Sequence, residues 1–188
     1  MIKTKNDLNR CLQLEAELYN ANHWYSSIRA WFIPSVSTQI YKYIRLLRFT
    51  EYFHNNSFHK TGIKKNILND LFYLFYLRRK SKLGAKLGLE VGLNSVDEGM
   101  LIYHAGYLVV NYEARIGKNV RFHGCNCVGN STSGVPTIGD NVEFGVGSSV
   151  IGGITIADHV KIGAGAVVTK SVLEPGSVVG GVPAKKIK

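Results

Sequence analysis

The sequence has little proline, little cysteine and no long apolar run. It contains 4 prolines and 45% hydrophobic residues among 188, which excludes a largely disordered chain and allows a real core. The most apolar stretch, Leu71–Leu77, is far too short to span a bilayer. Because the first residues are polar and predict a capped helix, no secretory signal is expected.

Cysteine occurs 3 times, at Cys11, Cys125 and Cys127, without the spacing of a disulfide scaffold. We therefore expect reduced thiols and a cytoplasmic protein. No second cysteine or histidine pair with ligand spacing accompanies Cys125 and Cys127, so no metal site is predicted. We interpret these two residues as small side chains within a strand.

Acidic residues are scarce in residues 1–88, where 5 stand against 15 lysines and arginines, whereas residues 89–188 have 8 of each kind. The net charge of +10 therefore belongs to the first part, and we predict two regions, 1–88 and 89–188. Such a basic region suits an anionic partner: a membrane surface, a phosphorylated carrier or an acidic glycan. A solvated helical face would have the same composition.

Residues 1–88 have the periodicity of helices. Thr4 and Asp7 predict a capping box at the start of the first. The helix that follows has these residues at helical spacing: Leu8, Cys11, Leu12, Glu15 and Leu18. A second helix has an apolar face with its cations largely outside that face, namely Ile40, Ile44 and Leu47 on the face, and Lys42, Arg45 and Arg48 outside it.

A third helix is expected over Ile67–Leu77, after a polar gap at His54–Gly62. It should end at the cations that follow, Arg78–Lys80, because positive charge stabilises a helix C-terminus. We expect its aromatic residues to pack against other helices or a subunit rather than to bind a cofactor: Phe72, Tyr73, Phe75 and Tyr76.

From Val110 onward the sequence has a period of six. The recurring residues are Val110, Ile116, Phe122, Val128, Ile138, Phe144, Val150, Ile156, Ile162 and Val168. Neither a helix nor a hairpin has this spacing, whereas a prism of three parallel sheets does, with about eighteen residues in each coil. The one longer step, from Val128 to Ile138, predicts a loop over Asn130–Thr137 that leaves the prism. The fold class is therefore mainly β, a parallel β-helix preceded by an α-helical region.

Two segments near the C-terminus, IGAGAVVTK and Gly181–Lys185, resemble hexapeptide-repeat acyltransferases. Together with GMLIYHAGYLVVNYEARIGKNV they are similar to the serine acetyltransferase branch, and within it to capsule and exopolysaccharide enzymes with a shortened helical region. The resemblance covers Gly99–Lys188. It implies a left-handed coil, although parallel crossovers are normally right-handed. It also implies trimers with active sites between neighbouring prisms.

Acetyl-CoA is the donor that the resemblance implies. It places the pantetheine arm beside three small residues that allow close approach to the main chain, Gly147, Ala164 and Gly165. Thr169 and Lys170 would then face the nucleotide end. Lys185, with Lys186, would neutralise the phosphates. The same residues would also suit tight corners and a soluble tail.

His104 matches the position of the family's catalytic histidine, which implies a general base that removes the proton of an attacking hydroxyl. A structural imidazole is the alternative. His123 lies nineteen residues further on, close to one coil length, so it is expected either near His104 in contact with substrate or at an ordinary strand position.

Several positions depart from the serine acetyltransferases. Tyr103, a candidate substrate contact, replaces the acid that precedes their catalytic histidine, and Gly134 and Val135 replace an Arg-His pair. These lost groups are the ones expected to bind the ammonium and carboxylate of an amino acid. The acid that orients the imidazole aligns near Leu89, where this chain has none. The candidate orienting acids are Glu90, Asp97, Glu98 and Glu113.

The leading hypothesis is an O-acetyltransferase that moves acetyl from acetyl-CoA to a sugar hydroxyl of a surface-polysaccharide precursor, such as one carried on a lipid. It would work as a homotrimer, with the basic half at the inner membrane surface and with no nucleic-acid partner. One alternative is L-serine O-acetylation in cysteine biosynthesis. A second is a non-catalytic β-helix that serves as an assembly module.

Overall fold

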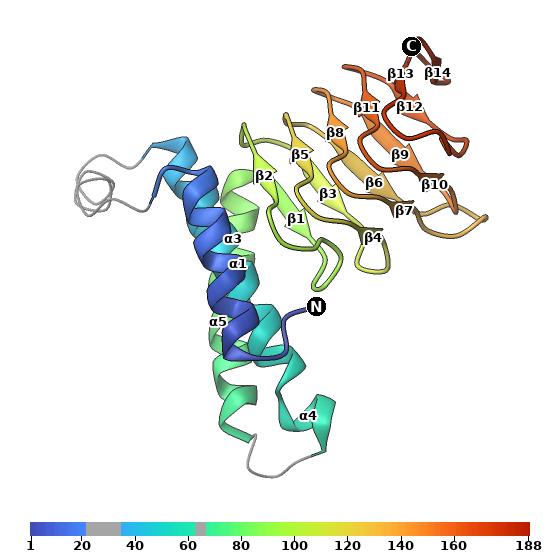
Figure 1. Cartoon of the computed structure of the whole chain (residues 1–188). Helices are drawn as coiled ribbons and strands as arrows, with labels where there is room; N and C mark the ends of the chain where they lie inside the picture. Colours follow the sequence, from blue (N-terminus) through green and yellow to red (C-terminus); the bar gives the residue numbers. More distant parts are fainter. Residues whose placement is uncertain (22–34, 63–66) are drawn as a thin grey trace. The chain divides into compact units, whose positions relative to one another are not determined.

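The structure, a computed structural model, describes residues 1–21, 35–62 and 67–188. They form two compact units, Met1–Leu87 and Gly88–Lys188 (Figure 1). The first unit is helical, and the second is the predicted left-handed parallel β-helix, so the expected fold class is confirmed. Among the described residues, no helix has the length and apolar character needed to cross a membrane.

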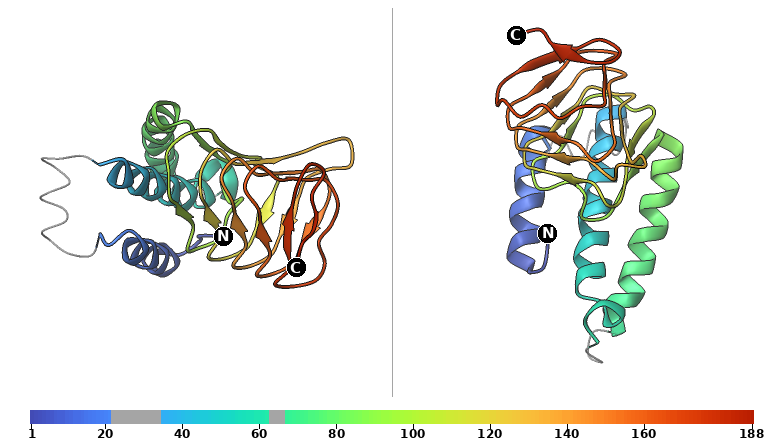
Figure 2. Two further views of the ribbon diagram at one scale, coloured as in Figure 1. Left: turned by 90° about the horizontal axis from the view of Figure 1, so that it is seen from above. Right: turned by 90° about the vertical axis from the view of Figure 1, so that its right-hand side faces the viewer.

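The helical unit contains α1 (Lys5–Leu18), α3 (Val36–Asn55), α4 (Phe58–Thr61) and α5 (Ile67–Leu87). Helix α3 packs against both α1 and α5 (Figure 2). The predicted capping box is confirmed, because Thr4 Oγ1 accepts a hydrogen bond from the Asp7 amide at 3.1 Å and Asp7 Oδ2 accepts one from the Thr4 amide at 2.9 Å. These bonds to Thr4 lower the pKa of the Asp7 carboxyl.

Aromatic rings join α3 to α5. Phe53 stacks on Phe72 at 5.0 Å between ring centroids and on Tyr76 at 5.3 Å. Two more pairs lie beside them, namely Phe49 with Tyr76 and His54 with Tyr73. Packing against another helix is therefore confirmed for three of the four predicted aromatic residues, whereas Phe75 is half exposed.

The expected end of the third helix is wrong, because α5 continues through the cations to Leu87. Ser81–Leu87 consists mainly of good helix formers, and the single Gly84 does not interrupt them. The residue after the helix, Gly88, has φ +71°, a left-handed conformation that ends helices readily. The cations Arg78–Lys80 therefore lie inside a helix and not at its C-terminus.

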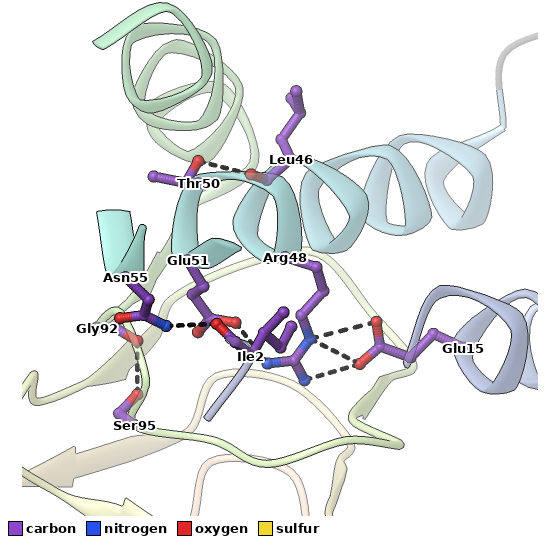
Figure 3. A network of polar contacts seen from close by, with 9 residues as sticks. All are labelled: Ile2, Glu15, Leu46, Arg48, Thr50, Glu51, Asn55, Gly92 and Ser95. Atoms are coloured by element: carbon purple, nitrogen blue, oxygen red, sulfur yellow. Dashed lines mark hydrogen bonds and ion pairs between the residues drawn. The ribbon is translucent and has the colours of Figure 1, made fainter. Parts of the chain in front are cut away.

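The prediction that Arg48 lies outside the apolar face is also wrong. Its guanidinium is buried and donates from Nη2 to Glu15 Oε1 at 2.7 Å and from Nη1 to Glu51 Oε2 at 3.0 Å (Figure 3). Arg48 lies four residues after Ile44 and thus on the same side of α3. Its charge enters the core because two buried carboxylates neutralise it.

These three charges change one another's titration. Burial raises the pKa of the Glu15 carboxyl, although Arg48 acts in the opposite direction. For Arg48, burial alone would lower the pKa, but Glu15 and Glu51 together hold it well above its usual value. Arg48 is therefore permanently charged in the centre of the helical unit.

The β-helix has three sheets, whose strands come from successive coils. Sheet A has five strands, namely β1 (Leu89–Val91), β3 (Leu108–Val110), β6 (Cys127–Gly129), β9 (Ser149–Ile151) and β12 (Val167–Val168). Sheet B has three, namely β4 (Arg115–Ile116), β7 (Thr137–Ile138) and β10 (Thr155–Ile156). Sheet C has six, namely β2 (Leu101–Ile102), β5 (Arg121–Phe122), β8 (Glu143–Phe144), β11 (Lys161–Ile162), β13 (Val178–Gly180) and β14 (Lys185–Lys186). All pairs are parallel except β13 with β14.

The predicted inward positions are confirmed. Every residue of the six-residue series is buried, with at most 3% of its surface exposed. Each one aligns with its counterpart in the next coil, as Phe144 does with Ile162 and Val150 with Val168. The core is thus a column of aliphatic and aromatic side chains along the prism.

The coils differ in length where the sequence departs from its period. Phe144 and Ile162 are eighteen positions apart, but Phe122 and Phe144 are twenty-two apart because the coil between them includes the predicted loop. That loop joins β6 to β7 and projects from the prism (Figure 2). In the first coil, Ile102 and Phe122 are twenty positions apart. These two irregular coils carry most of the candidate acceptor residues.

Candidate active site

One edge of the prism carries the predicted base and part of the predicted donor site. The turns along it join sheet C to sheet A and comprise residues 103–107, 123–126, 145–148 and 163–166. We call it the His104 edge. It contains His104, Gly147, Ala164 and Gly165, which are separated by up to sixty-one residues in the sequence. The fold therefore gathers these predicted site residues along one line.

Backbone hydrogen bonds fix the turns of this edge to one another. The Gly147 amide donates to the Gly124 carbonyl at 2.9 Å, and the Gly165 amide donates to the Val146 carbonyl at 2.8 Å. The buried Asn126 side chain adds four contacts: it accepts from the Gly124 amide and donates to the Gly145 carbonyl and to both the carbonyl and Oγ of Ser148. Asn126 was not predicted from the sequence. A buried amide inside a turn has no period or motif that would reveal it.

His104 is exposed on this edge, next to Gly124 of the following coil. A side chain at position 124 would begin 3.3 Å from His104 Cβ, so glycine there leaves room beside the imidazole. Within the described residues, no group forms a hydrogen bond or ion pair with the His104 side chain. The ring is thus open to an incoming hydroxyl and has no orienting partner among the residues that the structure describes.

The four candidate orienting acids lie elsewhere on the prism. Glu90 is exposed in β1 of sheet A. Asp97 precedes β2, at the turn from sheet B to sheet C, and Glu113 lies at the turn from sheet A to sheet B. Glu98 forms an ion pair with Lys118 at 3.1 Å. Within the described part of the chain, none of these carboxylates forms a hydrogen bond or ion pair with the His104 side chain, so an orienting role for any of them stays a prediction.

Tyr103 and His123 form a stacked pair, with ring centroids 4.6 Å apart. Because the first coil has twenty residues and not nineteen, His123 aligns with Tyr103, and Gly124 aligns with His104. His123 Nε2 lies 2.8 Å from Glu143 Oε1 in β8. Glu143 was missed in the sequence because the long coil places it twenty positions after His123, at a distance that matches neither repeat.

The predicted donor residues fall into two groups. Gly147 and Gly165 on the His104 edge have φ of +70° and +65°, which glycine adopts readily and other residues rarely. A side chain at Gly165 would meet nothing within 4 Å, so the backbone there is open to a ligand. Thr169 and Lys170 are exposed one strand further on, at the turn that leaves sheet A. The chain therefore divides the predicted donor site between the two edges of sheet A.

The C-terminal tail folds back on the last coil. The Val167 amide donates to the Gly181 carbonyl at 3.0 Å, and the Ala184 amide donates to the Val167 carbonyl at 2.9 Å. Lys185 then pairs with Gly180 in β14, with its side chain exposed. Lys186 forms an ion pair with Glu174 at 2.6 Å. Lys185 is thus held near the end of the prism by its backbone.

The loop after β6 lies at the turn from sheet A to sheet B. Ser133 Oγ accepts a hydrogen bond from the Gly153 amide at 2.9 Å, and it lies 2.8 Å from Ser131 Oγ. Gly134, at a position where the resemblance predicts part of an Arg-His pair in the serine enzymes, has φ +112° and is exposed. The loop has a defined structure without the charged pair.

The cysteines have separate surroundings. Cys127 lies in β6 as predicted, and burial raises the pKa of its thiol. Cys125 is not in a strand, which corrects the prediction: it lies in the turn before β6 with φ +55° and is exposed. The described residues contain no cluster of three or more histidine, cysteine, aspartate or glutamate side chains placed to hold a metal ion.

The repeat and the fold both have known counterparts. Residues 136–170 match the family described as bacterial transferase hexapeptide (six repeats). The β-helix carries the hexapeptide repeat of bacterial transferases. No curated protein matches the chain by sequence.

Solved serine acetyltransferases share the fold. The enzyme from Brucella abortus strain S19 is 25% identical with a TM-score of 0.69, and the match covers 95% of this chain and 68% of that one. The soybean apoenzyme is 20% identical with a TM-score of 0.72, covering 97% and 70%. A serine acetyltransferase in complex with CoA is 17% identical with a TM-score of 0.67, covering 97% and 71%. The transferase repeat and this shared fold support an acetyltransferase.

Proposed function

We propose that this protein transfers an acetyl group from acetyl-CoA to a hydroxyl, with His104 as general base. The observation that carries the proposal is the His104 edge, where an exposed imidazole lies on the same line of turns as the open backbone at Gly147 and Gly165. The solved complex of a structurally similar serine acetyltransferase with CoA supports the choice of donor.

The proposed reaction needs one base and one oxyanion site. His104 takes the proton as the hydroxyl oxygen attacks the thioester carbonyl, and backbone amides of the neighbouring turns stabilise the tetrahedral oxyanion. Collapse of the intermediate breaks the carbon–sulfur bond. The thiolate of CoA then receives the proton from the His104 imidazolium, which restores the neutral base and releases the acetyl ester.

The proposed acceptor is a sugar hydroxyl of a surface-polysaccharide precursor. Tyr103, Gly134 and Val135 stand where the serine enzymes have an acid and an Arg-His pair, so this chain lacks ionic partners for a free amino acid at those positions. L-serine is the second candidate acceptor, because the similar solved structures are serine acetyltransferases. Parallel assays with L-serine and with sugar acceptors separate the two, and efficient turnover of free serine would contradict the sugar proposal.

A homotrimer with shared active sites is part of the proposal. Thr169, Lys170 and the Asn130–Thr137 loop lie at one side of sheet A, whereas His104 lies at the other. Neighbouring prisms side by side would bring these two edges together and complete the donor site. Light scattering combined with activity measurement tests this point, since a fully active monomer would contradict shared sites.

We also propose that the basic half binds an anionic membrane surface. Large apolar side chains of α5 are about half exposed or more: Ile67, Leu68, Leu71, Phe72, Leu74 and Phe75. Cations follow them in the same helix: Arg78, Arg79, Lys80, Lys82 and Lys86. Apolar residues beside lysine and arginine are typical of helices at a lipid surface. We expect the protein to co-sediment with phosphatidylglycerol vesicles but not with phosphatidylcholine vesicles. If a second copy of the chain covers this face instead, the protein should bind neither kind of vesicle.

The histidine assignment is tested by His104→Asn, with His159→Asn as the matched control. His159 is exposed in another turn of the same prism, with φ +60°, which asparagine tolerates. We expect His104→Asn to reduce turnover by about 10²–10⁴-fold, because general-base catalysis typically contributes that much. Acetyl-CoA should still raise the melting temperature of the variant. Unchanged activity, with no stabilisation by acetyl-CoA, would instead favour the assembly-module alternative.

A further inference from the structure

Three side chains form a polar and aromatic cluster next to His104: Tyr103 in the turn after β2, His123 in the turn after β5, and Glu143 in β8. Tyr103 stacks on His123, and His123 Nε2 lies 2.8 Å from Glu143 Oε1. All three are partly exposed, with 41% of Tyr103 accessible and about a third of the His123 and Glu143 side chains. The cluster therefore faces solvent on the prism surface and does not belong to the core.

The carboxylate fixes the tautomer of the neutral imidazole. A carboxylate only accepts hydrogen bonds, so the neutral His123 ring must carry its proton on Nε2 and donate it to Glu143. Nδ1 then has a lone pair. Within the described residues, no interaction occupies that atom. Glu143 thus makes His123 an acceptor of hydrogen bonds at Nδ1, which is the state that a hydroxyl donor requires.

The cluster lies next to the proposed general base in the sequence and in the fold. Tyr103 immediately precedes His104, and His123 immediately precedes Gly124, whose missing side chain leaves room beside His104. The cluster therefore lies one residue away from His104 in its own coil and one residue away from Gly124 in the next coil. Arg121 and Lys161 lie on either side of Glu143 in sheet C, and Lys161 Nζ is 3.9 Å from Glu143 Oε2.

We infer that Tyr103, His123 and Glu143 form the acceptor subsite, and that they select an uncharged ring with several hydroxyls. The Tyr103 ring packs against the C–H face of such a ring, while His123 Nδ1 accepts a hydrogen bond from one of its hydroxyls. Glu143 is a positioning residue because it acts on the acceptor through His123. This inference rests on the proposed acetyl transfer and specifies its substrate class.

The test compares Glu143→Gln with Glu174→Gln in the full-length protein. Glu174 is the matched control, since its carboxylate also forms an ion pair, with Lys186, but lies in the C-terminal segment. The probes are free hexoses, nitrophenyl hexopyranosides and L-serine, with acetyl-CoA as donor. The readouts are the KM for each acceptor, the KM for acetyl-CoA and kcat.

Glu143→Gln should raise the sugar KM by about 10- to 100-fold, as expected for the loss of a hydrogen bond that involves a charged group. The KM for acetyl-CoA should not change, and Glu174→Gln should behave as the wild type. His123→Asn should raise the sugar KM similarly, and the double variant should add little, because the two residues act as one unit. If the ion pair had only a structural role, Glu143→Gln would change the stability of the protein but would not raise the sugar KM while leaving the KM for acetyl-CoA unchanged.

The possible results distinguish a failure of the acceptor subsite from a failure of the proposed acetyl transfer to sugars. If the wild type acetylates sugars and Glu143→Gln leaves their KM unchanged, the subsite is wrong while acetyl transfer stands. If the wild type transfers acetyl only to L-serine, both the subsite and the sugar proposal are wrong. Saturation-transfer NMR with the same sugars gives a readout without turnover. Equal binding by wild type and Glu143→Gln, or no binding by the wild type, would also overturn the inference.

Discussion

In the β-helix each coil repeats the same inward position, whereas in the helical unit a charged cluster lies among the buried side chains. Every member of the six-residue series is an apolar side chain that stacks on its counterpart. The helical unit places Arg48 between Glu15 and Glu51 with all three buried. A periodic core tolerates local change, because each coil contacts only its neighbours, but a single charged cluster depends on every member.

The largest loss of stability is expected from a change in the buried charged cluster of the helical unit. Arg48→Met removes the cation and leaves Glu15 and Glu51 buried without a partner of opposite charge. The expected loss is on the order of 3–5 kcal/mol of unfolding free energy. Urea unfolding, monitored by hydrogen exchange in peptides from each unit, should assign the loss to Met1–Leu87. The control is Lys42→Met, an exposed cation on the same helix. Equal stability of the two variants would show that the cluster contributes nothing to the fold.

A core change in the β-helix should be milder and confined to that unit. Ile156 is buried between Ile138 and the bridge residue Val172 of adjacent coils. Ile156→Ala should reduce the unfolding free energy by about 2–5 kcal/mol, depending on how far the neighbouring coils close the cavity. Leu173→Ala, at an exposed position, should change it by less than about 0.5 kcal/mol. A loss that appears in the helical unit as well would contradict independent units.

These two regions also differ in what their sequence predicts. One residue in six determines the β-helix, so its inward series and its one long step could be read directly. Arg48 was misplaced because a helical pattern ranks arginine as polar and cannot show that two distant carboxylates neutralise it. The proposed acceptor subsite could be predicted only in part, for another reason. Tyr103, His123 and Glu143 come together across coils of irregular length, and only the strand register fixes which residues align.

The buried cluster should also make the helical unit sensitive to pH. The pKa of Glu15 is raised on folding, so the folded state holds the proton more tightly than the unfolded state does. Its stabilising contribution is therefore complete below the usual glutamate pKa and is lost as pH rises through the folded value. Comparing wild type with Glu15→Gln across this range cancels the opposite effect of Asp7, whose pKa is lowered. Wild type should lose stability relative to the variant as pH rises, and the reverse slope would refute the assignment.

The smallest effect concerns the start of α1, where the helical unit uses exposed polar contacts. Thr4→Ala removes the side-chain acceptor of the Asp7 amide and half of the capping box. An N-cap substitution of this kind typically costs about 1 kcal/mol. Thr4→Ser keeps the hydroxyl and should behave as the wild type. Because α1 supplies Glu15 to Arg48, fraying should spread from Thr4 along α1 and increase hydrogen exchange around the buried cluster, but not in the β-helix. Increased exchange confined to the first turn would show that the cluster, and not the cap, determines where α1 lies.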